Sequence, residues 1–357
     1  MSGSGTVYSD LKVFAHPDRI QGLLENRRVA PIYVRIKPTN ICNQSCKYCC
    51  YAQGMRVDDR VVNHCESIPW HILESAVDDM GDMGVKAVTF SGGGDPLCYE
   101  HIVDAVNKVK SRNIDYSIIT NGQLLCGKKA ECLYDAKWIR ISLDAATEET
   151  YRAIRSVDTF DGIVDNLKSF VNEKSKQCTV GINCVISKDN YQEIYEICKL
   201  CYEIGCNNIK LTPIRISENE IGYHDEIKGN VERQIGQAKE DFENSNFTII
   251  DKYKQEVQVL GDYQKIYHRC YIQELFTVIG ADCKLYRCHQ RAYTKTGEIG
   301  DLRKNKFKDI WMSEETRLLT LEYDPTIECK MGGCVFETRN EVLMSFMNLD
   351  INHINFI

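Results

Sequence analysis

The sequence predicts an α/β fold in which crossover helices cover a parallel sheet. Strand-like and helix-like segments alternate from about residue 32 to residue 212, and this alternation is typical of parallel strands joined by helices. Hydrophobic residues make up 43% of the 357 residues, which is enough for a large core. A chain of this length exceeds one minimal domain, so we expect one large domain and a smaller one.

Six short segments have the composition of buried strands, and helical patterns lie between most of them. The strands are expected at residues 32–36, 85–90, 116–120, 138–143, 179–186 and 208–212. The helices are expected near residues 18–27, 101–110, 128–134, 160–172 and 191–204. A further helix should begin at a cap on Ser67, with Pro69 in its first turn, and end at Gly81 and Gly84.

Charge and cysteine content narrow the classes of function. The net charge is −7 and no basic run is present, which argues against a nucleic-acid substrate. No apolar run reaches membrane-spanning length and no apolar signal core opens the chain, so we expect a cytoplasmic protein with no membrane partner. In that compartment, 18 cysteines indicate metal sites and buried thiols, and Cys184, Cys198 and Cys201 fall in apolar patterns typical of a core.

Three cysteines follow the first predicted strand in the pattern C-x3-C-x2-C. They are Cys42, Cys46 and Cys49. Three thiolates on one loop can hold three irons of a [4Fe–4S] cluster and leave the fourth iron open, whereas structural zinc usually has four closed ligands. The alternative is an accidental group in a cysteine-rich chain.

With Tyr48 before the third cysteine, this loop resembles the signature of the radical S-adenosylmethionine (SAM) superfamily. The resemblance implies a partial (β/α)6 TIM-type barrel with its chemistry at the carboxyl ends of the strands. It also implies that SAM binds the open iron and is cleaved by one electron to a 5′-deoxyadenosyl radical.

A glycine-rich loop after the second strand is similar to the family loop that binds the amino group of SAM. It consists of Gly92, Gly93, Gly94 and Asp95. Glycines let a backbone approach a ligand closely. Asp95 replaces the family's glutamate, which favours a backbone role over a side-chain role, and the alternative is an ordinary turn.

Polar residues at the next two strand ends complete the SAM site that the resemblance implies. Asn121 would reach the methionine part of SAM, unless it only forms an Asn-Gly turn. Ser142 and Asp144 belong to a Ser-Leu-Asp stretch whose serine contacts SAM in relatives. Arg155 would pair with the SAM carboxylate, with Arg152 as the competing candidate.

The adenine of SAM would be flanked by the last strand and by the cysteine loop. Ile209 and Leu211 are expected on one side of it and the Tyr48 backbone on the other. These contacts would come from backbone and apolar groups.

A second group of cysteines lies in the C-terminal third, at Cys270, Cys288, Cys329 and Cys334. Strands at residues 275–279 and 284–288 are expected to form a hairpin, followed by a helix at 307–321. The arrangement resembles the "twitch" module, a half-size relative of the SPASM extension, which carries one auxiliary [4Fe–4S] cluster. Cys283 replaces the usual hairpin glycine and is a further possible ligand, and zinc is the structural alternative.

These assignments divide the chain into five parts. They are a lead-in at 1–30, the partial barrel at 31–215, a connector at 216–268 with a helix near 231–244, a twitch-like domain at 269–338, and a C-terminal helix and tail at 339–357.

The predicted function is that of a radical SAM oxidoreductase with two [4Fe–4S] clusters, dehydrogenating a small sugar-like, nucleotide-sugar or cyclitol substrate. His289 is the candidate base for the proton, and the auxiliary cluster would take the electron. Glu274 and Arg291 are further candidates for substrate binding. Flavodoxin or ferredoxin is the expected electron donor.

Several alternatives stay open. A sugar epimerase or dehydratase would need no different site. Sulfatase maturation or ribosomal-peptide modification is less expected, because no peptide-recognition domain is evident and only one auxiliary cluster is predicted. The molybdenum-cofactor cyclase family, which has a three-cysteine auxiliary site, is not expected either. A metal-stabilised scaffold without catalysis is the alternative outside enzymes.

Overall fold

The computed structural model describes residues 9–51, 59–215, 222–257, 265–329, 334–350, 352, 353 and 355. One ten-stranded sheet runs through them in the order β10-β9-β8-β1-β2-β3-β4-β5-β6-β7. The strands are β1 (Tyr33–Ile36), β2 (Ala87–Phe90), β3 (Asp115–Thr120), β4 (Trp138–Ser142), β5 (Thr179–Ile186), β6 (Asn208–Pro213), β7 (Thr248–Asp251), β8 (Phe276–Ile279), β9 (Lys284–Tyr286) and β10 (Glu298–Asp301).

The predicted parallel α/β fold is confirmed. Strands β1 to β7 pair in parallel with their sequence neighbours, and β8 adds in parallel to the free side of β1. In the described part of the chain the sheet ends at β7 and β10, so it is an open, partial barrel. All six predicted strands are present, whereas β7 and β10 were missed.

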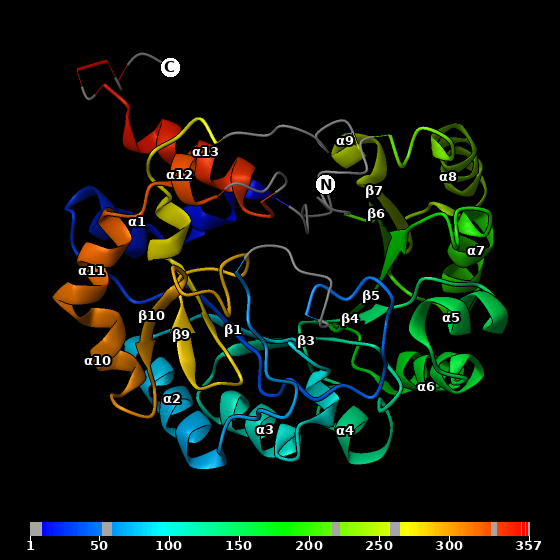
Figure 1. Ribbon diagram of the computed structural model, residues 1–357, viewed down its shortest axis with the longest axis horizontal. Helices are drawn as coiled ribbons and strands as arrows, with labels where there is room; N and C mark the ends of the chain where they lie inside the picture. The colour runs from blue at the N-terminus through cyan, green and yellow to red at the C-terminus, as the bar shows by residue number, and fades with distance from the viewer. Residues whose placement is uncertain are drawn as a thin grey trace.

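The barrel helices follow the convex side of the curved sheet (Figure 1). They are α2 (Trp70–Met83), α3 (Ile102–Ser111), α4 (Gly127–Glu131), α5 (Glu148–Arg155), α6 (Phe160–Glu173), α7 (Ile194–Ile204) and α8 (Lys228–Phe242). The other helices are η1 (Asp10–Ala15), α1 (Pro17–Leu24), η2 (Pro96–Cys98), α9 (Tyr253–Val257), η4 (Tyr271–Glu274), α10 (Phe307–Met312), α11 (Glu314–Leu321), α12 (Pro325–Glu328) and α13 (Glu337–Met347).

Two helix boundaries differ from the predictions. Helix α2 begins after Pro69 rather than at a Ser67 cap, although it ends at Gly84 in the left-handed conformation (φ 73°), as the glycine predicted. The predicted helix at 307–321 is two helices. Ser313 ends α10 with extended backbone and caps α11, because its side chain accepts a hydrogen bond from the Thr316 amide.

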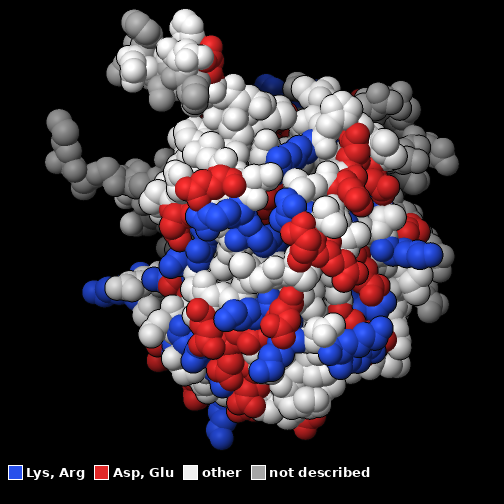
Figure 2. Space-filling model, turned by 90° about the vertical axis from the view of Figure 1, so that its left-hand side faces the viewer, with Lys and Arg blue, Asp and Glu red and all other residues white. Residues whose placement is uncertain are grey.

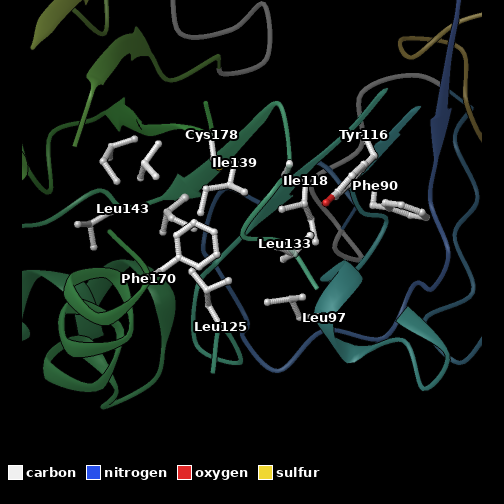
Figure 3. Close-up of a cluster of buried hydrophobic side chains, with 14 of the residues drawn as sticks. Phe90, Leu97, Tyr116, Ile118, Leu125, Leu133, Ile139, Leu143, Phe170 and Cys178 are labelled. Atoms are coloured by element: carbon white, nitrogen blue, oxygen red, sulfur yellow. The ribbon is translucent and has the colours of Figure 1, made fainter. Parts of the chain in front are cut away.

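The main core fills the space between the sheet and the helices. Figure 3 shows its centre, where Phe90, Ile118 and Ile139 from the strands meet Leu133 and Phe170 from the helical layer. Burying each such side chain contributes about 1.5–3 kcal/mol. Cys184, Cys198 and Cys201 are buried in this core, as predicted.

The opposite side of the sheet is more polar at its centre. On β1, Val34 and Ile36 are fully buried in the main core, whereas Tyr33 and Arg35 are half-buried on the other side. A strand alternates its side chains between the two faces, so Lys37, which follows β1, lies on the same side as Arg35. This alternation leaves charged groups facing the inside of the barrel.

The C-terminal hairpin is part of the barrel sheet, because β8 pairs with β1 from Tyr33↔Phe276 to Ile36↔Ile279. A second, smaller core joins β8 and β9 to the N-terminal segment and to α13, and contains Val13, Leu23, Phe276 and Leu343. The five-part division of the chain stays a prediction.

The surface that carries α10 and α11 mixes acidic and basic side chains (Figure 2). Arg317 of α11, for example, pairs with Glu314 at 2.7 Å. Among the described helices, none is long and apolar enough to cross a membrane.

Candidate active site

The cysteine loop and the glycine-rich loop lie against each other at the carboxyl ends of β1 and β2. The Gly94 amide donates to Thr39 O at 3.0 Å, and the Asp95 amide donates to Ile41 O at 3.0 Å. A Cβ atom on Gly93 would lie 1.9 Å from Asn40 Oδ1, and one on Gly94 would lie 2.0 Å from Ile41 O. Only glycine allows this close approach.

The second half of the cysteine loop rests on the end of α5. The Ser45 and Lys47 amides donate to the Arg155 and Ile154 carbonyls at 3.3 and 3.0 Å. Arg155 Nη1 lies 3.3 Å from Cys46 Sγ. Arg155 therefore contacts the cysteine loop through its side chain as well as its backbone.

Asn121 lies beside the first half of the same loop. Its Nδ2 donates to Asn43 Oδ1 at 2.7 Å and reaches Cys42 Sγ at 3.9 Å. Burial raises the pKa of the Cys42 thiol to about 12. A polar donor beside this sulfur therefore acts against the desolvation that disfavours its thiolate.

Asp95 joins the two strand ends that form the site. Its buried carboxylate accepts hydrogen bonds from Thr120 Oγ1 at 2.9 Å, from the Asn121 amide at 2.6 Å and from the Leu97 amide at 2.9 Å. In this structure its side chain therefore holds the glycine-rich loop to the end of β3.

Arg155 forms a buried ion pair with Asp144. Asp144 also accepts from the Tyr48 hydroxyl and from the Val185 amide, the latter at 2.8 Å. The competing candidate, Arg152, is 58% exposed and pairs with Asp158. The geometry thus favours Arg155 over Arg152 as the arginine of the site.

The other residues predicted to contact SAM differ in how far their side chains are buried. Ser142 ends β4 beside Asn183 of β5 and is half-buried. Ile209 and Leu211 are fully buried in the helix-facing core. Only their backbone is therefore available to a ligand inside the barrel.

The C-terminal cysteines surround one cavity of about 50 Å³. Cys270, Cys288, Cys329 and Cys334 all line it, although they come from distant parts of the sequence. Cys283 is elsewhere, because it packs in the main core with left-handed backbone (φ 62°). The structure therefore separates Cys283 from the other four.

The four cavity cysteines lie close enough to interact electrostatically. In the described residues, no three His, Cys, Asp or Glu side chains converge on a single metal position. Burial first, and Cys334 and Cys329 next, raise the pKa of Cys288 to about 12.

His289 lies between the two cysteine sites, on the loop after β9. Its Nδ1 atom is buried and has no hydrogen-bond partner. Burial first, and then Arg35, Lys37 and Arg60, hold the pKa of His289 well below its usual range. The imidazole is therefore neutral near pH 7 in this state.

The three basic residues near His289 were missed in the sequence. Lys37 is fully buried and donates to the Tyr51 hydroxyl and to Gly92 O, the latter at 3.2 Å. The sequence feature that could have revealed two of them is the alternation of β1, because it places Arg35 and Lys37 on the face opposite Val34 and Ile36.

The two further substrate-binding candidates form ion pairs within the protein. Glu274 pairs with Arg269 at 2.9 Å, and Arg291 pairs with Glu328 at 3.7 Å.

Comparisons with known proteins identify the barrel. Residues 36–201 match the family model described as the Radical SAM superfamily. A probable GTP 3′,8-cyclase of Saccharolobus islandicus is 26% identical over 204 residues, which cover 55% of this chain and 62% of that protein. The GTP 3′,8-cyclase of Clostridium perfringens is 29% identical over 238 residues, 64% of each protein. The matches thus span about three fifths of the curated relatives' length.

Solved structures share the fold over more of the chain. Streptococcus suis SuiB bound to its precursor peptide SuiA aligns with a TM-score of 0.61 and 16% identity, over 89% of this chain and 73% of SuiB. Native anSMEcpe with bound AdoMet aligns with a TM-score of 0.61 and 18% identity, over 92% of this chain and all of the other. None of these comparisons supports a sugar substrate, and cyclases are an enzyme class that the sequence analysis had set aside.

Proposed function

Because this chain carries a radical SAM domain, we propose that Cys42, Cys46 and Cys49 hold its [4Fe–4S] cluster. The observation that carries this assignment is the contact between the cysteine loop and the glycine-rich loop, together with the donors beside Cys42 and Cys46. The cluster and SAM together supply a 5′-deoxyadenosyl radical, which removes a hydrogen atom from a substrate.

The strand-end residues would bind and orient SAM. The backbone of Gly92 to Gly94 is the proposed partner of its amino group. Arg155 would hold the SAM carboxylate with a charge-assisted pair, sharing its guanidinium with Asp144. Asp95 is a positioning residue in this proposal, since its carboxylate is fully used in joining β2 to β3.

The four cysteines of the C-terminal cavity are proposed to hold a second [4Fe–4S] cluster. Four thiols around one cavity leave no free coordination position, which suits electron transfer rather than substrate binding. Tyr323 supports this environment, because its hydroxyl lies 3.3 Å from Cys329 Sγ. Zinc at the same position would remove the electron acceptor.

The proposed reaction is a two-electron oxidation of a substrate bound between the two cysteine sites. After one hydrogen atom is removed, the substrate radical loses a proton and an electron. His289, with its free Nδ1, is proposed to take the proton, and the cavity cysteines would place the electron acceptor nearby. The sugar and cyclitol substrates of the sequence analysis are not carried into this proposal, because no comparison supports them.

A redox-neutral radical reaction is the second candidate. The curated relatives are named as cyclases, and a cyclisation requires no net oxidation by the enzyme. This candidate gains weight if the C-terminal cavity binds zinc.

The test is reductive SAM cleavage by anaerobically reconstituted protein. With dithionite, the parent protein should form 5′-deoxyadenosine from SAM, and the Cys46→Ala variant should form none. The Cys65→Ala variant is the matched control, because Cys65 is an exposed cysteine outside both sites. A Cys46→Ala variant that cleaves SAM at the parent rate would overturn the assignment.

A further inference from the structure

Three basic side chains meet inside the barrel around one aromatic ring. Lys37 Nζ lies 4.1 Å from the centre of the Tyr51 ring, and the Arg60 guanidinium carbon lies 5.1 Å from it. Arg35 lies on the same side of β1 as Lys37. All three act electrostatically on His289, so they form one group, which we call the lumen cations.

Among the described residues, the lumen cations have no acidic partner. Within the described residues, no aspartate or glutamate lies within ion-pair distance of Arg35, Lys37 or Arg60. Their protein partners are neutral oxygens: Tyr33 Oη for Arg35, Tyr51 Oη and Gly92 O for Lys37, and Gln290 O for Arg60. This contrasts with the outer surface, where acidic and basic side chains intermingle (Figure 2).

Several polar atoms of the group are buried and unused. Arg35 Nε, Arg60 Nε and His289 Nδ1 all lack a hydrogen-bond partner. Buried charges are normally paired, because removal from water is costly without a counter-charge. Burial holds the pKa of Lys37 well below its usual range, and Arg35 and Arg60 each keep an idle Nε donor, so this group indicates a missing anion.

The group lies between the two cysteine sites. Lys37 bonds to Gly92 of the glycine-rich loop and interacts with Cys49 and Cys50. Arg60 bonds to the carbonyl of Gln290, two residues after Cys288. An anion held here would therefore place the rest of its molecule where the proposed function requires the substrate.

We propose that Arg35, Lys37 and Arg60 bind a phosphate or diphosphate group of the substrate, so that this enzyme acts on a phosphorylated small molecule. The inference rests on the proposed function, since it names the substrate class of that site. A phosphate ester carries close to two negative charges near neutral pH, with several acceptor oxygens, whereas a carboxylate carries only one charge. Guanidinium groups also suit phosphate oxygens geometrically.

The test is binding of defined probes to the reconstituted protein with SAM present, measured by calorimetry. The probes are uridine diphosphate, inorganic phosphate and uridine. Uridine diphosphate should bind at least tenfold more tightly than uridine, since each charge-assisted hydrogen bond is worth about a tenfold change or more. Binding of inorganic phosphate alone at equal strength would show that the group recognises the free ion rather than a phosphorylated molecule.

Two variants assign the binding to the lumen cations. Arg60→Gln and Lys37→Met should each weaken binding of uridine diphosphate by tenfold or more. The control is Lys86→Gln, which removes one exposed positive charge just before the amino end of β2. If Lys37→Met does not fold, Arg60→Gln still decides the question.

Iron content and SAM cleavage are measured on the same samples. Equal binding by the parent, Arg60→Gln and Lys37→Met, with iron and SAM cleavage intact, would overturn this inference and leave the proposed function standing. Absence of iron or of SAM cleavage in the parent would instead remove the proposed function.

Discussion

The two cysteine sites of this protein are built in different ways. The first takes three cysteines from one loop of eight residues, Cys42 to Cys49, and Asn121 after β3 and Arg155 at the end of α5 supply polar donors to its sulfurs. The second takes four cysteines from distant segments around a cavity that Tyr267, Tyr323 and Phe336 also line. In the proposed function, the first is an open centre that binds SAM and the second is a closed centre that transfers an electron.

The largest expected effect separates the two sites by their metal. The double variant Cys329→Ala, Cys334→Ala should lose about half of the parent's iron, because two cubic clusters hold equal amounts. It should keep 5′-deoxyadenosine formation, which depends on the first site. Iron and zinc are measured in both proteins. A parent protein that holds zinc and the iron of only one cluster would contradict the two-cluster account.

The polar surroundings of the first site can be tested at Arg155. Arg155→Met leaves Asp144 buried without its ion-pair partner, so unfolding free energy should fall by about 3–5 kcal/mol. The matched control is Arg152→Met on the same helix, which breaks an exposed pair and should cost under about 1 kcal/mol. Denaturant unfolding measures both, and equal costs would contradict the buried-pair reading.

Asp95 tests whether the glycine-rich loop depends on its side-chain bonds. Asp95→Ala leaves the Thr120 hydroxyl and the Asn121 and Leu97 amides without their acceptor, and we expect a loss of about 2–4 kcal/mol. Asp95→Asn keeps one acceptor oxygen and should lose less. If both variants unfold like the parent in denaturant, the joining role is wrong.

The smallest effect is expected at Cys283. The residue has left-handed backbone, which glycine adopts without strain, but its thiol is packed in the core. Cys283→Gly should therefore change unfolding free energy by no more than about 1 kcal/mol and leave the iron content unchanged. Loss of iron in this variant would show that Cys283 is a ligand of the second cluster after all.

The first site has its cysteines on one loop and the second has them on separate segments. This difference explains how much of each site could be predicted from the sequence. The three-cysteine loop is contiguous, so its spacing alone indicated the chemistry, and the strand before it was marked by its alternating pattern at residues 32–36. The second site depends on tertiary contacts between segments of different sequence position, such as the hydrogen bonds of Asn340 in α13 with the Tyr271 amide and the Arg269 carbonyl. Its four cysteines could be named, but the exclusion of Cys283 needed the structure.

The parts that were missed share a cause, which is tertiary context. Strand β7 lies in a charged stretch and is stabilised by pairing with β6, so its own sequence carries a weak signal. The helix at 307–321 breaks because Ser313 offers a cap that competes with helix continuation. Arg60 joins Arg35 and Lys37 only through the fold, so no sequence pattern brought them together.

The most direct test of the two-site account is low-temperature EPR with iron analysis on the anaerobically reconstituted parent and its Cys42/Cys46/Cys49→Ala variant. We predict two [4Fe–4S] signals in the reduced parent, one of which changes when SAM is added. The variant should keep the other signal, about half of the iron and no response to SAM. A variant that holds no iron would contradict the account, because the four-cysteine cavity would then not be a cluster site.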